Sequence, residues 1–102
     1  MAFSYDIGSF SNHMVSGELH IINKLGLHAR AASKFVTCAS RFSSTIRVSK
    51  DGQAADGKSI MSVMMLAAGK GSVLEVEIEG DDEQAAFNAL TELVGDYFGE
   101  GE

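Results

Sequence analysis

Residues 72–80 read SVLEVEIEG, and their apolar and acidic side chains alternate with a period of two. In an extended strand, this alternation places every second side chain on the same face of a sheet. One face of the strand is apolar and the other is acidic, with Leu74, Val76 and Ile78 opposite Glu75, Glu77 and Glu79. A strand with one buried face is typical of an antiparallel sheet that helices cover on one side only.

The remaining segments supply the partners that such a sheet needs. Alternation and turn residues predict three more strands, at residues 18–23, 44–50 and 53–57, with a hairpin turn at Asp51-Gly52. Apolar residues at helical spacing predict three helices, at residues 29–39, 59–68 and 82–98. The order is βαββαβα. We therefore expect an α+β fold: a two-layer, open-faced β-sandwich with a four-stranded antiparallel sheet and three helices on one face.

Both ends of the chain are expected to lie outside the packed fold. Residues 1–13 show no sustained period, and His13-Met14 resembles a cloning junction, so this segment is predicted to be a tag or a flexible native arm. Residues 14–102 are then a single domain. Asp81 or Asp82 is expected to cap the last helix, and the tail GEGE (99–102) is expected to fray.

Composition and charge restrict the function. The chain has 102 residues, 45% of them hydrophobic, and a net charge of −6, which suits one core and argues against nucleic-acid or membrane partners. No segment has the length and apolar character of a membrane-spanning helix or the pattern of a secretory signal. Because Cys38 is the single cysteine, no intrachain disulfide can form, and a reducing, cytoplasmic location is expected.

Residues 52–59, GQAADGKS, match the spacing of the phosphate-binding loop of nucleotide triphosphatases. A working loop of that kind follows a buried parallel strand and opens a long helix, in a domain of roughly 150 residues or more. Here the preceding segment has the pattern of a weak hairpin strand, and Asp56 would place a negative charge beside the phosphates. The simpler interpretation is a turn at Gly52, a strand end at Gly57 and a helix cap at Ser59.

A histidine at the start of the first predicted helix is the stronger candidate for phosphate chemistry. His28 in NKLGLHARAASKFV (23–36) precedes amides that have no partner within the helix and that attract anions. The helix dipole favours neutral imidazole, the nucleophilic form, and Arg30 can contact phosphate oxygens. The alternative is that His28 is a local cap and Arg30 a solvated charge. His20 is expected at the surface and Cys38 in the core, and no metal site is expected.

Several motifs in order resemble the HPr family, the histidine-containing phosphocarriers of the bacterial sugar phosphotransferase system. GLHARAA (26–32) is similar to its active-site stretch, GKSIMSVMMLAA (57–68) to its second helix and serine region, and GSVLEVEIEGDDEQAA (71–86) to its closing strand and last helix. The resemblance extends from residue 18 to about residue 98. It implies the open-faced sandwich that the element order also predicts.

The resemblance also implies roles for individual residues. His28 matches the residue that enzyme I phosphorylates on Nδ1, with phosphoenolpyruvate as the original donor, and that passes the group to enzyme II components of the IIA type. Arg30 matches the arginine that assists at the phosphate. Ser59 matches the serine that a dedicated kinase phosphorylates in many members. A carrier of this kind is a substrate of its partners, not an enzyme, is expected to be a monomer, and needs no cofactor.

Two features of the sequence add to this expectation. Ala31 stands where the family usually has proline, so the first turn gains an N–H group and loses rigidity, which puts the rate of transfer in doubt. The second predicted helix carries more apolar surface than one buried face needs. HPr-like proteins dock partners with this helix, so Ile60, Met61 and Met65 are predicted to bind partners. The alternative is that they fill the core.

Three rival functions remain at this point. Within the family, the chain could be a nitrogen-related or regulatory carrier instead of a sugar carrier. From another class, it could be an interaction domain that acts through the helix beginning at Ser59, with His28 idle. The third rival is a nucleotide-binding protein that uses residues 52–59.

Overall fold

A computed structural model describes residues 14–100 of the chain, so the expectations for residues 1–13 and for the last two residues of the tail lie outside the described part. The sheet has four strands in the order β1-β4-β2-β3, and every neighbouring pair is antiparallel. In chain order the elements are β1 Met14–His20, α1 Ala29–Ala39, β2 Thr45–Lys50, β3 Gln53–Asp56, α2 Ile60–Met65, β4 Val73–Glu79, α3 Glu83–Gly95 and the 3-10 turn η1 Tyr97–Gly99.

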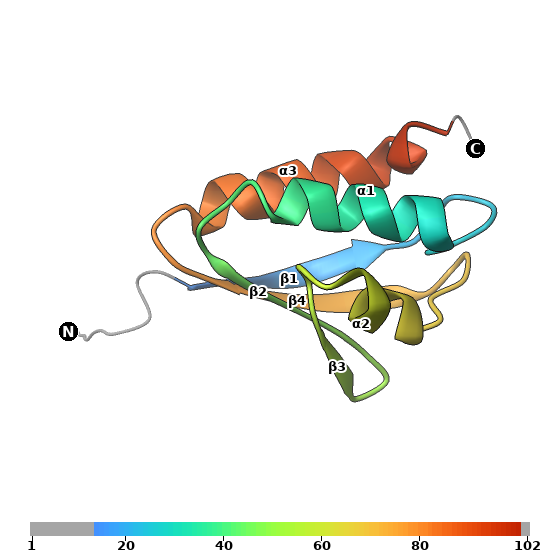
Figure 1. Ribbon diagram of the computed structural model, residues 1–102, viewed down its shortest axis with the longest axis horizontal. Coiled ribbons are helices and arrows are strands. Elements are labelled where there is room, and N and C mark those ends of the chain that lie inside the picture. Colours follow the sequence, from blue (N-terminus) through green and yellow to red (C-terminus); the bar gives the residue numbers. More distant parts are fainter. Residues whose placement is uncertain (1–13, 101–102) are drawn as a thin grey trace.

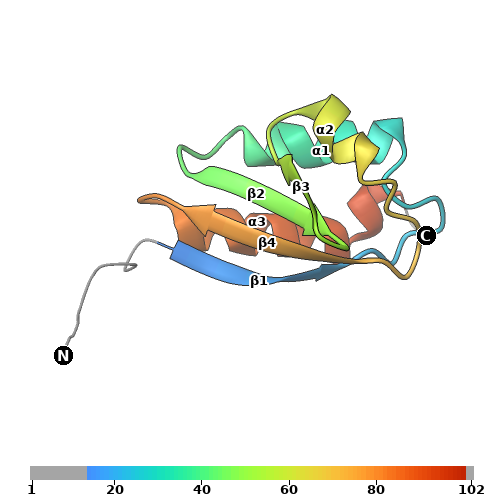
Figure 2. The same ribbon diagram turned by 90° about the horizontal axis from the view of Figure 1, so that it is seen from below.

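The core lies on one face of the sheet. Figure 1 shows α1 and α3 side by side in one layer over the strands, and Figure 2, seen from below, shows the strands in front of α3. In β4, Leu74, Val76 and Ile78 are buried while the three glutamates between and beside them are exposed. The predicted open-faced sandwich, with three helices on one face, is confirmed.

The first strand differs from its predicted bounds of 18–23. It begins at Met14 because β4 pairs with it over seven consecutive positions, from Met14 opposite Glu79 to His20 opposite Val73. It ends at His20, and Asn23 lies in the following loop, where its buried amide donates to the carbonyl oxygen of Gly26 at 2.8 Å. The pairing with β4 therefore sets the bounds of this edge strand. The alternation of side chains within β1 does not reveal those bounds.

Two helices end earlier than predicted. α2 ends at Met65, not at residue 68, because Ala67 adopts a left-handed conformation (φ 51°) and the Ala68 carbonyl accepts a bond from Leu27 N at 2.8 Å. α3 ends at Gly95, not at residue 98, and a left-handed turn follows it. This turn carries Phe98 into the core, where its side chain is completely buried.

Asp82 lies at the N-cap position of α3, but its carboxylate does not cap the helix. It accepts hydrogen bonds instead from Ser43 N at 2.8 Å, from Ser44 N at 3.0 Å and from the Ser44 hydroxyl. Asp82 thereby ties the β4–α3 connection to the α1–β2 connection. These bonds, chiefly the one from the Ser44 hydroxyl, lower the pKa of Asp82 from 3.8 to about 2.

Replacing Asp82 with asparagine should make stability less dependent on pH. The folded pKa of Asp82, about 2, is lower than its ordinary value of 3.8, so the ionised carboxylate stabilises the fold above that ordinary value. This stabilisation is lost as the pH falls toward the folded value. Urea unfolding should show D82N to be less stable than the wild type at neutral pH, with a difference that shrinks in acid. A difference that stays constant down to the folded pKa would contradict this role.

Candidate functional site

His28 occupies the N-cap position of α1. Its backbone is extended (φ −71°, ψ 177°), and its carbonyl accepts the first bond of the helix from Ala32 N at 2.8 Å. The amides of residues 29–31 come before that bond and have no carbonyl partner within α1. The imidazole makes no capping hydrogen bond. The histidine thus lies where the sequence predicts it, and the alternative of a local side-chain cap is not supported.

The loop before α1 is attached to the segment that follows α2. Gly26 adopts φ 69°, and a Cβ atom there would lie 2.5 Å from the Ala68 carbonyl oxygen, so only glycine fits. Leu27 is buried, and its amide donates to that same carbonyl at 2.8 Å. These contacts fix the backbone that carries His28, and they place the histidine loop beside the end of α2.

The imidazole contacts a carboxylate that sequence reasoning missed. His28 Nε2 lies 2.9 Å from Oε2 and 3.2 Å from Oε1 of Glu100, in the tail that was expected to fray. Both side chains are largely covered, with 27% of His28 and 16% of Glu100 exposed. The amide of Asn23 also approaches Glu100 Oε1, at 3.5 Å. No sequence signal could reveal this contact, because 72 residues separate its partners.

The contact with Glu100 determines which ring nitrogen is available. The hydrogen bond with His28 is the main reason that the pKa of Glu100 is lowered, although burial of the carboxyl opposes the effect. An ionised carboxylate can only accept, so Nε2 must carry the proton in the contact. In the neutral ring the lone pair is then on Nδ1. The contact therefore leaves Nδ1 as the ring nitrogen with a free lone pair.

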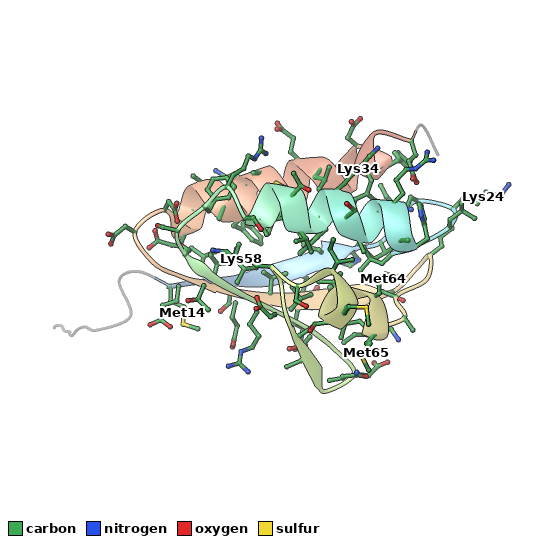
Figure 3. The ribbon with its side chains drawn as sticks, viewed as in Figure 1. Met14, Lys24, Lys34, Lys58, Met64 and Met65 are labelled. Atoms are coloured by element: carbon green, nitrogen blue, oxygen red, sulfur yellow. The ribbon has the colours of Figure 1, made fainter. Side chains whose placement is uncertain are left out.

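Positively charged side chains lie around the tail that carries Glu100. Arg30 is exposed on the first turn of α1, and Lys34 follows one turn later, where its Nζ donates to the Phe98 carbonyl at 2.7 Å. A pocket of about 520 Å³ lies here, lined by Lys24, Leu25, Arg30, Lys34, Gly99 and Glu100. Figure 3 shows Lys24 at the outer end of the molecule, in the loop before α1, and Lys34 on α1. Cationic groups beside a helix N-terminus suit a phosphoryl group.

The predicted partner-binding residues lie on α2. Ser59 is the N-cap of this helix, and its hydroxyl accepts a bond from Ser62 N at 3.3 Å. The side chains of Ile60, Met61 and Met65 are 41%, 72% and 66% exposed, so they do not fill the core, which was the alternative. Figure 3 shows the adjacent Met64 and Met65 on α2, at the opposite end of the sheet from Met14.

Residues 52–59 do not form a phosphate-binding loop. Gly52 (φ 86°) completes the β2–β3 hairpin, and β3 is an antiparallel edge strand, not a buried parallel one. The Gly57 amide donates to the Ile46 carbonyl at 2.7 Å, and Lys58 Nζ donates to the Phe42 carbonyl at 2.7 Å. The lysine and the glycine are thus engaged in the fold, and the helix that follows has six residues. The nucleotide-binding alternative does not fit this geometry.

The other two residues considered from the sequence, His20 and Cys38, lie in ordinary structural environments. His20 is exposed on β1 with its Nε2 3.5 Å from Glu18 Oε1, and Cys38 is buried in α1. Between residues 14 and 100, no group of three or more histidine, cysteine or acidic side chains could hold a metal ion. In the same range, no helix has the length and apolar character required to cross a membrane.

Comparison with known proteins identifies the family. Residues 15–96 match the family model of the PTS HPr component phosphorylation site. The chain belongs to the HPr family. It is 55% identical to the phosphocarrier protein HPr of Neisseria meningitidis over 87% of this chain and all of that protein. It is 57% identical to the HPr of Pseudomonas aeruginosa over 83% of this chain and 96% of that one.

Solved structures agree with this assignment. The crystal structure of HPr-C-His from Thermoanaerobacter tengcongensis is 46% identical with a TM-score of 0.81, over 84% of this chain and 97% of that one. The HPr of Bacillus anthracis is 42% identical with a TM-score of 0.76, over 79% and 96% of the two chains. HPr proteins are phosphocarriers, not enzymes. Membership implies that the chain works with enzymes of the phosphotransferase system, such as enzyme I and enzyme IIA.

Proposed function

We propose that His28 Nδ1 accepts a phosphoryl group from phospho-enzyme I, originally from phosphoenolpyruvate, and passes it to sugar-specific enzyme II components. The observation that carries this proposal is the bond between His28 Nε2 and Glu100, which leaves the ring's lone pair on Nδ1. Transfer requires an in-line approach of two active sites, so each partner enzyme supplies the other half of the chemistry.

The start of α1 stabilises the phosphorylated form of His28. The phosphoryl group brings negative charge to a helix N-terminus whose first amides lack helical partners. Arg30 extends from the first turn and supplies a guanidinium for the phosphate oxygens. Ala31 is buried, and its N–H adds a donor where the family usually has proline.

An apolar patch beside the histidine loop is proposed as the docking surface for both partners. We define this docking patch as Ile60, Met61 and Met65, all exposed on α2. The bond from Leu27 N to the Ala68 carbonyl connects the histidine loop to the segment after α2. A partner that covers the patch therefore reaches the histidine as well. Flexible methionine side chains can adapt to partners of different shape.

Ser59 is proposed as a regulatory site for a serine-directed kinase. A phosphate there would add negative charge at the start of α2, beside the docking patch, and would change how partners bind. Ser59 is partly exposed, and its hydroxyl accepts the capping bond from Ser62 N. Incorporation of phosphate by such a kinase into wild type and equally into S59A would rule this site out.

Each of the two rivals of the sugar-carrier role predicts a different experimental outcome. A nitrogen-related or regulatory carrier would accept phosphate from a different enzyme I and would not phosphorylate a sugar-specific enzyme II. An interaction domain that acts through α2 would keep its full biological activity in H28A. We favour the carrier, and we place it in the cytoplasm as a monomer formed by a single domain, residues 14–102.

Labelled phosphoenolpyruvate with enzyme I and Mg²⁺ should transfer label to the wild-type chain. The label should be lost in acid, as expected for a phosphoramidate on histidine. H28A should take up no label, whereas H20A should match the wild type because His20 lies exposed on β1. Label that survives acid, or that persists in H28A, would overturn the assignment of His28.

Arg30→Ala should slow phosphoryl transfer by about 10- to 100-fold, the value of one charge-assisted hydrogen bond. The exposed position of Arg30 means that the fold should remain intact, which circular dichroism and unfolding can check. Arg47→Ala is the matched control, since Arg47 is exposed on β2 and pairs with Glu77. Equal transfer rates for R30A and R47A would show that the Arg30 guanidinium does not act on the phosphate.

Met61→Glu should weaken productive docking with enzyme I by about tenfold or more, because burying an unpaired carboxylate is costly. The effect should appear in KM, with little change in kcat, because Met61 lies exposed on α2 and His28 lies at the start of α1. Met14→Glu introduces the same change at the other end of the sheet, on another exposed methionine. If M61E and M14E have the same KM, the docking patch is wrongly placed.

A further inference from the structure

The tail that carries Glu100 is held in place by contacts with three other parts of the fold. Phe98 is completely buried in the core, and its carbonyl accepts a bond from Lys34 Nζ of α1 at 2.7 Å. Glu100 Oε1 is 3.5 Å from the amide of Asn23, which is itself buried in the loop after β1.

The backbone of this tail adopts an unusual conformation that turns it toward His28. Tyr97, Phe98 and Gly99 have φ angles of 56°, 54° and 76°, and the first two are bulky residues that rarely adopt left-handed geometry. Such a turn persists only where surrounding contacts stabilise it. Here those contacts are the burial of Phe98 and the bond from Lys34. Because of this turn, the Glu100 carboxylate reaches a largely covered ring.

We propose that Glu100 is a positioning residue for phosphoryl transfer, which holds His28 in the Nε2–H tautomer and stabilises the positive charge that the ring gains. The inference rests on the proposed function of His28. In the accepting step, the Nδ1 lone pair forms a bond to phosphorus while the bond from phosphorus to the enzyme I donor atom breaks. The electrons of that broken bond return to the donor. Nε2 keeps its proton, so the ring becomes imidazolium-like and the adjacent carboxylate compensates its charge.

The surrounding charges give Glu100 a distinct part in this step. Arg30 and Lys34 on α1 and Lys24 in the preceding loop line the same pocket as Glu100, and all three are cationic. They suit the phosphoryl group, but they disfavour positive charge on the ring. Glu100 is the acidic side chain among the residues that line this pocket. A carboxylate that orients an imidazole and stabilises its charged form is the same arrangement that activates histidine in hydrolase triads.

Two substitutions of Glu100 separate its charge from its hydrogen bond. Glu100→Gln keeps an oxygen that can accept from Nε2–H but removes the charge, and Glu100→Ala removes both. Glu75→Gln is the control, because it makes the same change on the exposed face of β4. The readouts are single-turnover transfer from phospho-enzyme I and the ring-nitrogen NMR signals of neutral His28, which report the tautomer. A purely structural role of Glu100 would not change the tautomer.

We expect E100Q to accept phosphate about tenfold more slowly than the wild type while keeping the Nε2–H tautomer. E100A should be slower still and should populate both tautomers, and E75Q should match the wild type. A wild-type rate in E100A, or an unchanged tautomer in E100A, would overturn the inference. Failure of the proposed function is distinguishable, because the wild type itself would then take up no label.

Discussion

The hydrophobic core lies on a single face of the sheet, and the positions of the functional residues follow from that constraint. Because the inward residues of β4 all point to one side, all three helices must pack on that side. The connections at one end of the sheet are then brought together. There the Leu27 amide bonds to the Ala68 carbonyl, which joins the histidine loop to the segment after α2. The sheet thus places His28 beside a helix with exposed apolar side chains.

The proposed site combines two opposite electrostatic requirements around one imidazole. The phosphoryl group needs positive surroundings, which the first turn of α1 and Arg30 provide. The ring needs negative charge on its other nitrogen when it becomes imidazolium-like, and Glu100 lies 2.9 Å from Nε2. A carrier must hold its phosphate well enough to move between partners and weakly enough to release it. Because Arg30 and the first turn of α1 act on the phosphate while Glu100 acts on the ring, the holding and the release of the phosphate can be adjusted independently.

Local signals in the sequence were sufficient for most of the fold and for part of the site. The alternation in β4, the Asp51-Gly52 turn and the helix start at His28 each depend on neighbouring residues, so they could be predicted. The Glu100 contact could not, because it depends on a left-handed turn at Tyr97 and Phe98 that backbone preference disfavours. The early end of α2 was also missed, since a bond between Ala68 and distant Leu27 decides it. Long-range contacts overrode local propensity in both cases.

We propose that Nδ1 of His28 carries the phosphoryl group, because Glu100 holds Nε2. The most direct test is an NMR measurement of phosphorus–nitrogen coupling in the isotopically labelled protein after phosphorylation by enzyme I. We expect one phosphorus signal, coupled to Nδ1 of His28. Coupling to Nε2 of His28, or to a ring nitrogen of His20, would contradict it.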